Sequence, residues 1–367
     1  MGRANRDYGG YRGRRTVTDA LKFIAVALTV IVVLVLGGML YCQRYIVYTD
    51  EGPKLELPPF LEMFRREKGD PGGSTSLPDP GDVSVIIDPE GSQPSAVPGE
   101  PGEEDYILEL PVSDVIGGTA AGKLEEVKAE ALVLQMKAPS GQLAWRSGLF
   151  AADWSGVNAP QSNNDALKQW NEGEWYTVAR VCCFRDDSVP YSMNNLALRR
   201  GEFNWRDELG LRWISPAKEE AQAYIAGLCG ELAVLGFDEI LLEQFHFPTQ
   251  GNLGDIKQGD RYNPARFTGD LEDFLSQVQQ AVSPYGTKVS LRVDRDTLTG
   301  EENVSGVTAT LLERYAYRIW VEEDEYLSAP LELLRRVGIT GGAERLVFIT
   351  AGHGGDSEIT QAVFAES

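Results

Sequence analysis

The sequence predicts an α/β protein whose main domain, residues 106–367, is a TIM-type (β/α)8-like parallel barrel. Strand-like apolar stretches alternate with amphipathic helical stretches from Tyr106 onward. A domain of about 260 residues suits such a barrel better than a doubly wound sheet. The residues before 106 have compositions that do not fit a packed domain, so the barrel is expected to follow two other segments.

Apolar runs identify seven strands along this domain. They lie at residues 107–110, 131–136, 176–183, 240–247, 288–293, 317–322 and 345–350. Only seventeen residues follow Thr350. The eighth strand is therefore either hidden among these residues or absent, which would leave the barrel incomplete at its C-terminal end.

The helix before the fourth strand has the clearest signals. Ser215 is a good N-cap and Pro216 suits the first helical position. Apolar residues then recur at three- and four-residue spacing until Gly236, which should end the helix. A second amphipathic stretch at residues 270–286 precedes the fifth strand, and shorter ones lie near Leu311 and Leu331. This alternation is typical of a parallel sheet.

The N-terminal segment indicates a membrane anchor. Residues 23–42 are twenty consecutive uncharged, mostly apolar residues, which as a helix would span about 30 Å. Residues 1–49 carry seven basic and two acidic side chains, and six of the basic ones precede the apolar run. The positive-inside rule therefore places residues 1–22 in the cytoplasm and the barrel outside. No cleavage site is evident, so we expect an uncleaved, single-pass anchor in the cell membrane.

Residues 43–105 are expected to be a disordered linker. From residue 50 onward they hold ten of the nineteen prolines, eight glycines, and fourteen acidic against four basic side chains. Such a composition buries too little apolar surface to offset the entropy of the chain. The segment should therefore hold the barrel away from the membrane as a flexible tether.

Composition excludes several classes of function. A net charge of -21 offers no basic patch for nucleic acid. Four cysteines without a C-x-x-C pair, together with two histidines, cannot form a zinc site at familiar spacing, and no metal is predicted. Residues 117–123 have the G-x-x-x-x-G-K spacing of a phosphate loop, but Leu124 follows where a Ser or Thr is required. We expect an exposed Gly-rich turn there and no cofactor.

Side-chain alternation suggests which polar residues lie at the C-terminal ends of the strands, where barrel chemistry occurs. On the fourth strand Glu243 is the carboxylate expected inside. The candidates on the other strands are Gln135, Lys137, Arg180, Asp186, Ser290, Arg292 and Asp294. Charges of both signs should therefore converge. The alternative is a structural ion network of Glu243, Arg180 and Arg292.

Tryptophan placement is consistent with a sugar ligand. Six of the seven tryptophans fall between residues 145 and 213, mostly in loops expected after the second and third strands. Flat apolar ring faces can stack on pyranose rings, and Asp153, Asn158 and Asn204 could bond hydroxyl groups. Packing beneath long loops is the competing explanation.

The segments 176–186 (YTVARVCCFRD) and 236–248 (GFDEILLEQFHFP), with Trp205 and Trp213, resemble a glycosyl-hydrolase-type barrel family of bacterial envelope proteins with unknown substrate. The resemblance implies a TIM-type barrel and covers about residues 124–248 well.

The match to this family has to be read residue by residue. Arg180, Phe184 and Asp186 match its third strand, and Lys137 with Gly141 matches its second. The sequence departs from the pattern elsewhere. Glu243 stands where the family has an aspartate, and His246 stands where it has an arginine. Arg292 occupies a position that is usually acidic in the family, and Ala316 occupies one that is commonly an aspartate.

These observations predict a membrane-anchored protein that acts on a polysaccharide or cell-wall glycan. In the leading hypothesis Glu243 is a general acid, and Asp186 or Asp294 is the base or nucleophile. Substrate contacts are expected from Arg180, Lys137, Trp205, Trp213 and His246. The alternative is a catalytically degenerate barrel that binds wall polysaccharide or a protein partner, as Arg292 and Ala316 suggest.

Overall fold

A computed structural model describes residues 46–49, 52–55, 106–299, 304–323, 330–352 and 359–364. The chain divides into two units, Met1–Pro89 and Glu90–Ser367. In the first unit, β1 (Ile46–Thr49) and β2 (Gly52–Leu55) pair antiparallel. This short hairpin lies at the start of the expected linker, and the rest of that segment lies outside the described residues. Among the described helices, none combines the length and the apolar composition needed to span a bilayer. The predicted anchor at residues 23–42 lies outside the described residues.

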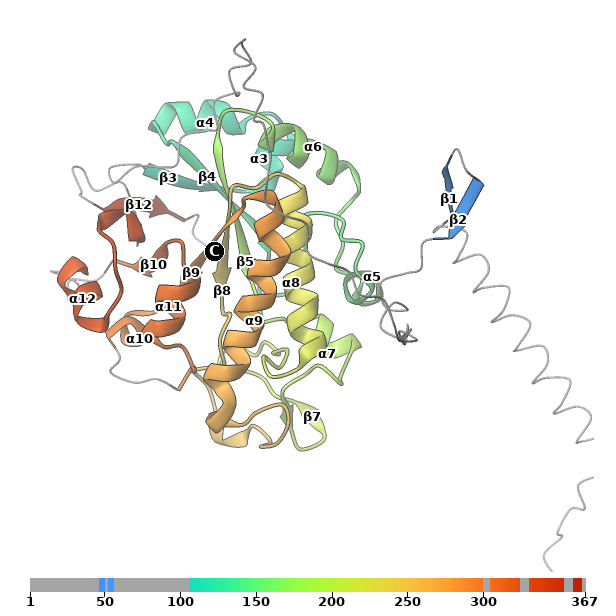
Figure 1. The fold of residues 1–367 in the computed structure, drawn as a ribbon, viewed down its shortest axis with the longest axis vertical. Coiled ribbons are helices and arrows are strands. Elements are labelled where there is room, and N and C mark those ends of the chain that lie inside the picture. The colour runs from blue at the N-terminus through green and yellow to red at the C-terminus, as the bar shows by residue number, and fades with distance from the viewer. Residues whose placement is uncertain are drawn as a thin grey trace, which may run out of the picture. The chain divides into compact units, whose positions relative to one another are not determined.

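The second unit is a closed barrel of eight parallel strands (Figure 1). The strands, in chain order, are β3 (Tyr106–Leu110), β4 (Ala131–Lys137), β5 (Tyr176–Cys182), β8 (Glu239–Glu243), β9 (Lys288–Arg292), β10 (Ile319–Glu322), β11 (Leu346–Thr350) and β12 (Thr360–Val363). All seven predicted strands are present. The eighth is β12, which pairs with β11 on one side and with β3 on the other and so closes the barrel. It is short and contains Thr and Gln, which is why no apolar run revealed it.

Helices and short turns connect the strands. They are α3 (Val112–Ile116), α4 (Ala120–Val127), α5 (Phe150–Ser155), α6 (Ser162–Asn171), α7 (Val189–Ser192), α8 (Glu219–Val234), α9 (Phe267–Val282), α10 (Arg295–Thr299), α11 (Ala309–Tyr315) and α12 (Pro330–Val337). Helices α8 and α9 lie side by side over β5, β8 and β9 (Figure 1). The α7 and β7 segments lie below the strands in that view, at the end where the strands finish.

The start of α8 differs from the prediction. The helix begins at Glu219, after Ser215 and Pro216, and Lys218 is its N-cap. Ser215 is held elsewhere, because its N–H donates to the Leu196 carbonyl and its hydroxyl donates to the Arg261 carbonyl. The other end agrees with the prediction, since Gly236 follows the helix with φ +91°.

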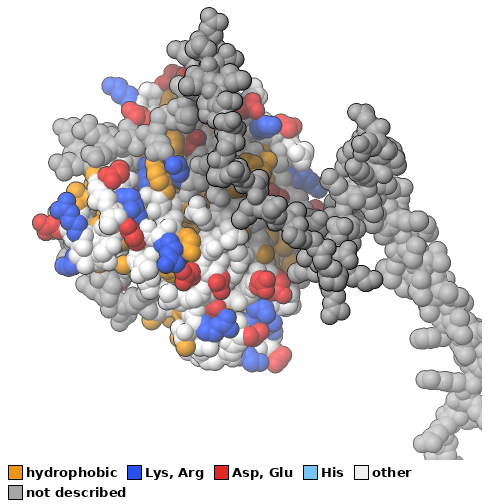
Figure 2. All heavy atoms as spheres, in the orientation of Figure 1, with side chains coloured by type: hydrophobic (Ala, Val, Ile, Leu, Met, Phe, Trp, Pro, Cys, Tyr) orange, Lys and Arg blue, Asp and Glu red, His pale blue; other side chains and the backbone are white. Residues whose placement is uncertain are grey.

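Buried apolar side chains form two clusters. The larger lies between the strands and the helices. The smaller lies inside the barrel and includes Val133, Val178, Leu241, Trp320 and Val347. Leu241 has Glu239 and Glu243 two residues on either side, so the alternation predicted for the fourth strand is confirmed. Outside, the face shown in Figure 2 carries acidic and basic side chains intermixed rather than in separate fields.

The N-terminal end of the barrel interior is closed by polar side chains around Glu239. This fully buried carboxylate accepts hydrogen bonds from Tyr176, Arg318 and Trp320, with a shortest distance of 2.6 Å to Arg318. Tyr176 lies on β5, and Arg318 and Trp320 lie at the start of β10, so the bonds join the strands on either side of β8 and β9. The buried Glu239 carboxylate is thus supplied with both a cation and hydrogen-bond donors.

Candidate active site

Five charged side chains of alternating sign line the C-terminal end of the barrel. They are Glu109 on β3, Arg180 on β5, Glu243 on β8, Arg292 on β9 and Glu322 on β10, and we call them the charged arc. Arg180 lies 3.2 Å from Glu109 and 3.6 Å from Glu243. Arg292 bonds Glu243 through Nη1 and lies 2.7 Å from Glu322 through Nη2. The arc therefore links five of the eight strands.

Glu243 is the centre of the arc. Its Oε1 accepts from Arg292 and its Oε2 faces Arg180, and only 9% of its side chain is exposed. A carboxylate placed between two guanidiniums is arranged as an ionised acceptor. The geometry therefore suits a nucleophile or base, whereas the sequence predicted a general acid.

The backbone turns sharply directly after Glu243. Gln244 has φ +47°, one of two described non-glycine residues in the left-handed region. This conformation ends β8 four residues before the predicted end of the strand. Such strained positions cluster at functional sites. Here the turn leaves Glu243 as the last residue of the strand, at the mouth of the barrel.

Arg292 stands where the resemblance implies an acidic residue. Its burial alone would lower the pKa of the guanidinium, but the carboxylates of Glu243 and Glu322 hold that pKa above its usual value. The Phe364 ring, one residue beyond β12, lies 4.6 Å from the Arg180 guanidinium carbon and 5.5 Å from that of Arg292. Both guanidiniums are therefore held between carboxylates and an aromatic ring.

Lys137 and Asp186 do not reach the mouth. Both side chains are fully buried, and they pair at 2.9 Å. Asp186 also accepts the backbone N–H groups of Ser188 and Val189, and Lys137 donates to the carbonyls of Cys182 and Cys183. Neither side chain is open to solvent in this structure, and their predicted roles, of Asp186 in catalysis and of Lys137 in substrate binding, stay predictions. The pair fixes the loop that follows β5.

Trp205 and Trp213 are also core residues. They are 1% and 2% exposed and meet edge to face at 6.5 Å. Their indole N–H groups donate to Asn252 and Asp207. This burial agrees with the competing explanation, packing beneath long loops. The stacking of sugars on these two rings stays a prediction.

The exposed aromatic side chains in these loops are different residues. Phe150 and Trp154 on α5, Tyr191 on α7 and Phe203 on β7 are all mostly exposed. Of these, only Trp154 belongs to the tryptophan cluster considered above. Nothing in the spacing of the tryptophans distinguishes Trp154 from its buried neighbours.

His246 and Asp294 differ in accessibility. His246 is buried, its Nδ1 lies 2.7 Å from the Phe247 carbonyl, and burial lowers the pKa of its imidazole. His246 is therefore not open to solvent in this structure, and its contact with substrate stays a prediction. Asp294 is exposed at the end of β9, where its carboxylate accepts the N–H of Thr297 at the start of α10. Asp294 remains available to a substrate.

The segment with phosphate-loop spacing forms a turn followed by α4. Gly118 has φ +71°, and Lys123 donates to Asp114 at 2.7 Å. Lys123 is thus bonded to a neighbouring side chain of the same segment, which agrees with the expected structural role of this turn. In the described part of the chain, no group of three or more His, Cys, Asp and Glu side chains is placed to hold a metal ion.

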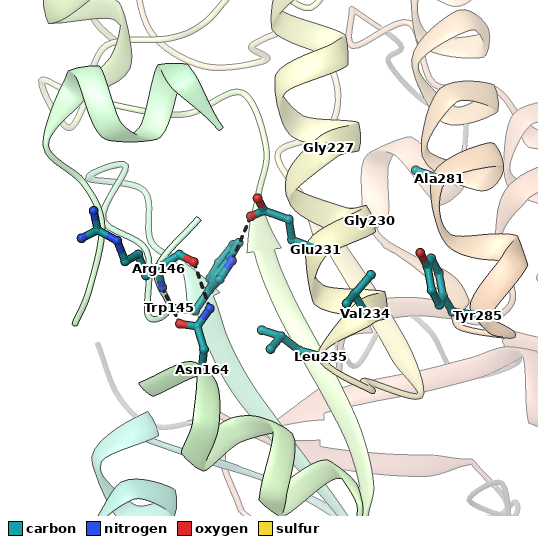
Figure 3. A pocket seen from close by; sticks show the side chains of 10 residues that line it. All are labelled: Trp145, Arg146, Asn164, Gly227, Gly230, Glu231, Val234, Leu235, Ala281 and Tyr285. Atoms are coloured by element: carbon teal, nitrogen blue, oxygen red, sulfur yellow. Dashed lines mark hydrogen bonds between the residues drawn. The ribbon is translucent and has the colours of Figure 1, made fainter. Parts of the chain in front are cut away.

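A separate groove of about 420 Å³ lies on the helical layer, away from the charged arc (Figure 3). Gly227 and Gly230 of α8 form its floor, and Tyr285 lines one side. Its polar groups are used internally. Glu231 accepts from Trp145 and Gly148, and Asn164 exchanges two hydrogen bonds with the Arg146 backbone. The groove therefore offers few free hydrogen-bonding groups to a ligand.

Comparison with known families identifies the barrel. The family model described as "Putative glycosyl hydrolase domain" matches residues 122–305, half of the chain. The chain belongs to this family. None of the curated proteins compared with it is similar.

Several solved structures are similar to this glycosyl hydrolase family member. A hypothetical protein from Ruminiclostridium thermocellum is 20% identical, with a TM-score of 0.43, over 50% of this chain and 96% of that one. The PgaB (BpsB) glycoside hydrolase domain of Bordetella bronchiseptica is 12% identical, with a TM-score of 0.47, over 67% and 84%. A GH20 exo-β-N-acetylglucosaminidase from Vibrio harveyi is 12% identical, with a TM-score of 0.45, over 68% of this chain and 41% of that one.

Proposed function

We propose that this protein hydrolyses a glycan at the mouth of its barrel, with Glu243 as the ionised carboxylate and Glu322 as the proton donor. One observation carries the proposal: Glu243 and Glu322 end the two strands that flank β9, and both are bonded to the guanidinium of Arg292 at the end of β9. A shared guanidinium keeps the two carboxyl groups close together, inside the upper limit of about 9.5 Å for the carboxyl pairs of glycosidases.

The exposure of the two carboxyl groups fits a division of roles. The Glu322 side chain is 73% exposed, so it can meet a leaving glycosidic oxygen, and it can carry a proton to that oxygen only after Arg292 has released it. Glu243 is nearly buried and can attack the anomeric carbon or take a proton from the attacking water. Arg292 would have to release one of them when substrate enters, while Arg180 would keep Glu243 oriented.

A second candidate function is binding without cleavage. It is favoured by Arg292 itself, because this side chain fills the space between the two carboxylates and satisfies both. In this case the charged arc is a structural network and the glycan binds above it. The two candidates make different predictions for the same variants.

The test is hydrolysis and binding of a glycan panel by the full chain and its variants. The panel should include polymers of N-acetylglucosamine and galactosamine. If the enzyme proposal is correct, Glu243→Gln and Glu322→Gln each lower the rate by about 10² or more while glycan affinity remains. Glu323→Gln, an exposed neighbour outside the arc, is the matched control and should retain activity.

Binding without cleavage predicts a different result. The parent should then bind a glycan and leave it intact. Glu243→Gln should lower the free energy of unfolding by about 3 kcal/mol, because Arg180 and Arg292 would be poorly paired.

We also propose that residues 23–42 anchor the barrel at the outer side of the cell membrane. The basic residues before the apolar run support this orientation. Protease added to intact protoplasts should digest the barrel, and protection would refute the orientation.

A further inference from the structure

A second cavity, of about 470 Å³, lies between two loops at the C-terminal side of the barrel. One wall is the hairpin of β6 (Arg199–Arg200) and β7 (Phe203–Asn204), which follows β5. The other wall is the segment around the short helix η2 (Leu253–Asp255), which follows β8. The volume falls within the usual range for small-molecule sites.

The cavity is formed before any ligand binds, because the two loops are bonded to each other. The Trp205 indole donates to the Asn252 carbonyl at 3.1 Å, and the Lys257 N–H donates to the Arg199 carbonyl at 2.7 Å. Gly251 brings the backbones together: a Cβ there would lie 3.3 Å from Trp205 and from the Asp207 backbone. A preorganised cavity loses less free energy when it orders a ligand.

The lining combines an aromatic face with polar groups of both kinds. The Phe203 side chain is 79% exposed, although its neighbour Trp205 is buried. Arg200 and Asp255 pair at 3.2 Å at the edge of the cavity, and both remain open to solvent. The exposed Asn252 side chain adds an amide, which is both a donor and an acceptor. The groove of Figure 3 lacks this combination, because its polar groups are already bonded to the protein.

We propose that this cavity is an outer subsite that binds one or two pyranose units of a glycan chain whose reacting bond lies at the charged arc. The inference rests on the proposed function. Phe203 would stack on the apolar face of a sugar ring, and Arg200, Asp255 and Asn252 would bond its hydroxyls. Each charged side chain that lines the cavity is already paired, Arg200 with Asp255 and Arg206 with Asp187, which favours an uncharged sugar unit.

The cavity and the charged arc are joined by a short stretch of chain. Asn252 comes nine positions after Glu243, so the two residues are no more than about 30 Å apart. A glycan chain of several sugar units can cover any distance within this limit. A ligand that occupies both sites gains the contact with Phe203, so Phe203 should favour substrates that are long enough to reach it.

The test compares Phe203→Ala with Phe150→Ala, a matched removal of an exposed aromatic ring outside the cavity. Titration of the full chain with polysaccharides and with short oligosaccharides of the same panel measures affinity. We expect Phe203→Ala to weaken polysaccharide binding by about tenfold, as loss of one aromatic stacking contact implies, and Phe150→Ala to leave it unchanged. Asp255→Asn should weaken binding without altering the fold, because the residue is on the surface.

The outcomes separate this inference from the proposed function. Polysaccharide binding that is weakened by Phe203→Ala, without any hydrolysis by the parent, supports the subsite and removes the enzyme proposal. Equal binding by the parent and Phe203→Ala overturns the subsite, even if the parent hydrolyses the polymer. Failure of the parent to bind any member of the panel also overturns it.

Discussion

The buried pair of Lys137 and Asp186 allows a quantitative prediction about stability. Changing Lys137 to Met keeps an unbranched side chain one atom shorter, and it removes the charge and the hydrogen bonds. The carboxylate of Asp186 then loses its 2.9 Å partner while it stays fully buried, and the carbonyls of Cys182 and Cys183 lose donors at 2.8 and 3.3 Å.

Breaking one side of a buried ion pair costs about 3 to 5 kcal/mol. For a domain of this size each kcal/mol lowers Tm by about 2 to 4 °C, so Lys137→Met should lower Tm by roughly 10 °C. Thermal and denaturant unfolding followed by circular dichroism measure both quantities.

The exposed pair of Lys123 and Asp114 provides the matched control. Its 2.7 Å separation is even shorter, but Lys123 is half exposed. Lys123→Met should therefore cost less than about 1 kcal/mol. Similar losses for the two variants would refute the reasoning, because burial would then not decide the strength of the pair.

Three further predictions follow from packing and burial. Gly141→Ala should destabilise the barrel by several kcal/mol, because a Cβ there would lie 2.4 Å from the Asp186 carboxylate. Gly156→Ala is also at positive φ but in open space, so it should cost only about 1 kcal/mol. Denaturant unfolding of the two variants compares these losses. Burial lowers the pKa of His246 in the folded state, so the contribution of this residue to the free energy of unfolding should be full above about pH 6.5 and fall as the pH drops below it. This pH dependence should shrink in His246→Gln. An unchanged pH dependence in the variant would count against a buried neutral imidazole. Burial raises the pKa of Cys182 and of Cys229 to about 12, so neither thiol should react with iodoacetamide at pH 8 until the protein unfolds; labelling of the native protein, seen by mass spectrometry, would contradict this.

The order of the strands and the inward residues could be predicted because both depend on local patterns. Apolar runs locate the seven barrel strands β3, β4, β5, β8, β9, β10 and β11, and two-residue alternation places Glu239, Leu241 and Glu243 on one face. The eighth strand could not be found, because Thr360 and Gln361 break its apolar pattern and only pairing with β3 makes it a strand.

The accessibility of candidate site residues could not be predicted, because it depends on loops that fold over the barrel. Asp186 and Trp213 follow strands, as catalytic residues do, yet a loop covers both. The alternative of an ion network around Glu243 did foresee its contacts with Arg180 and Arg292. The addition of Glu109 and Glu322 to this network required the three-dimensional register of β3 and β10.

The cluster around Glu239 has a consequence for how the gene can be divided. The family model ends at residue 305, but Arg318 and Trp320, which bond the Glu239 carboxylate, lie beyond it. A product cut at residue 305 would keep that carboxylate in the interior without its cation and would expose the edges of β3 and β9 to pairing with other molecules. The region that relatives share is therefore shorter than the region that must be translated together, and expression plasmids should extend at least through Val363.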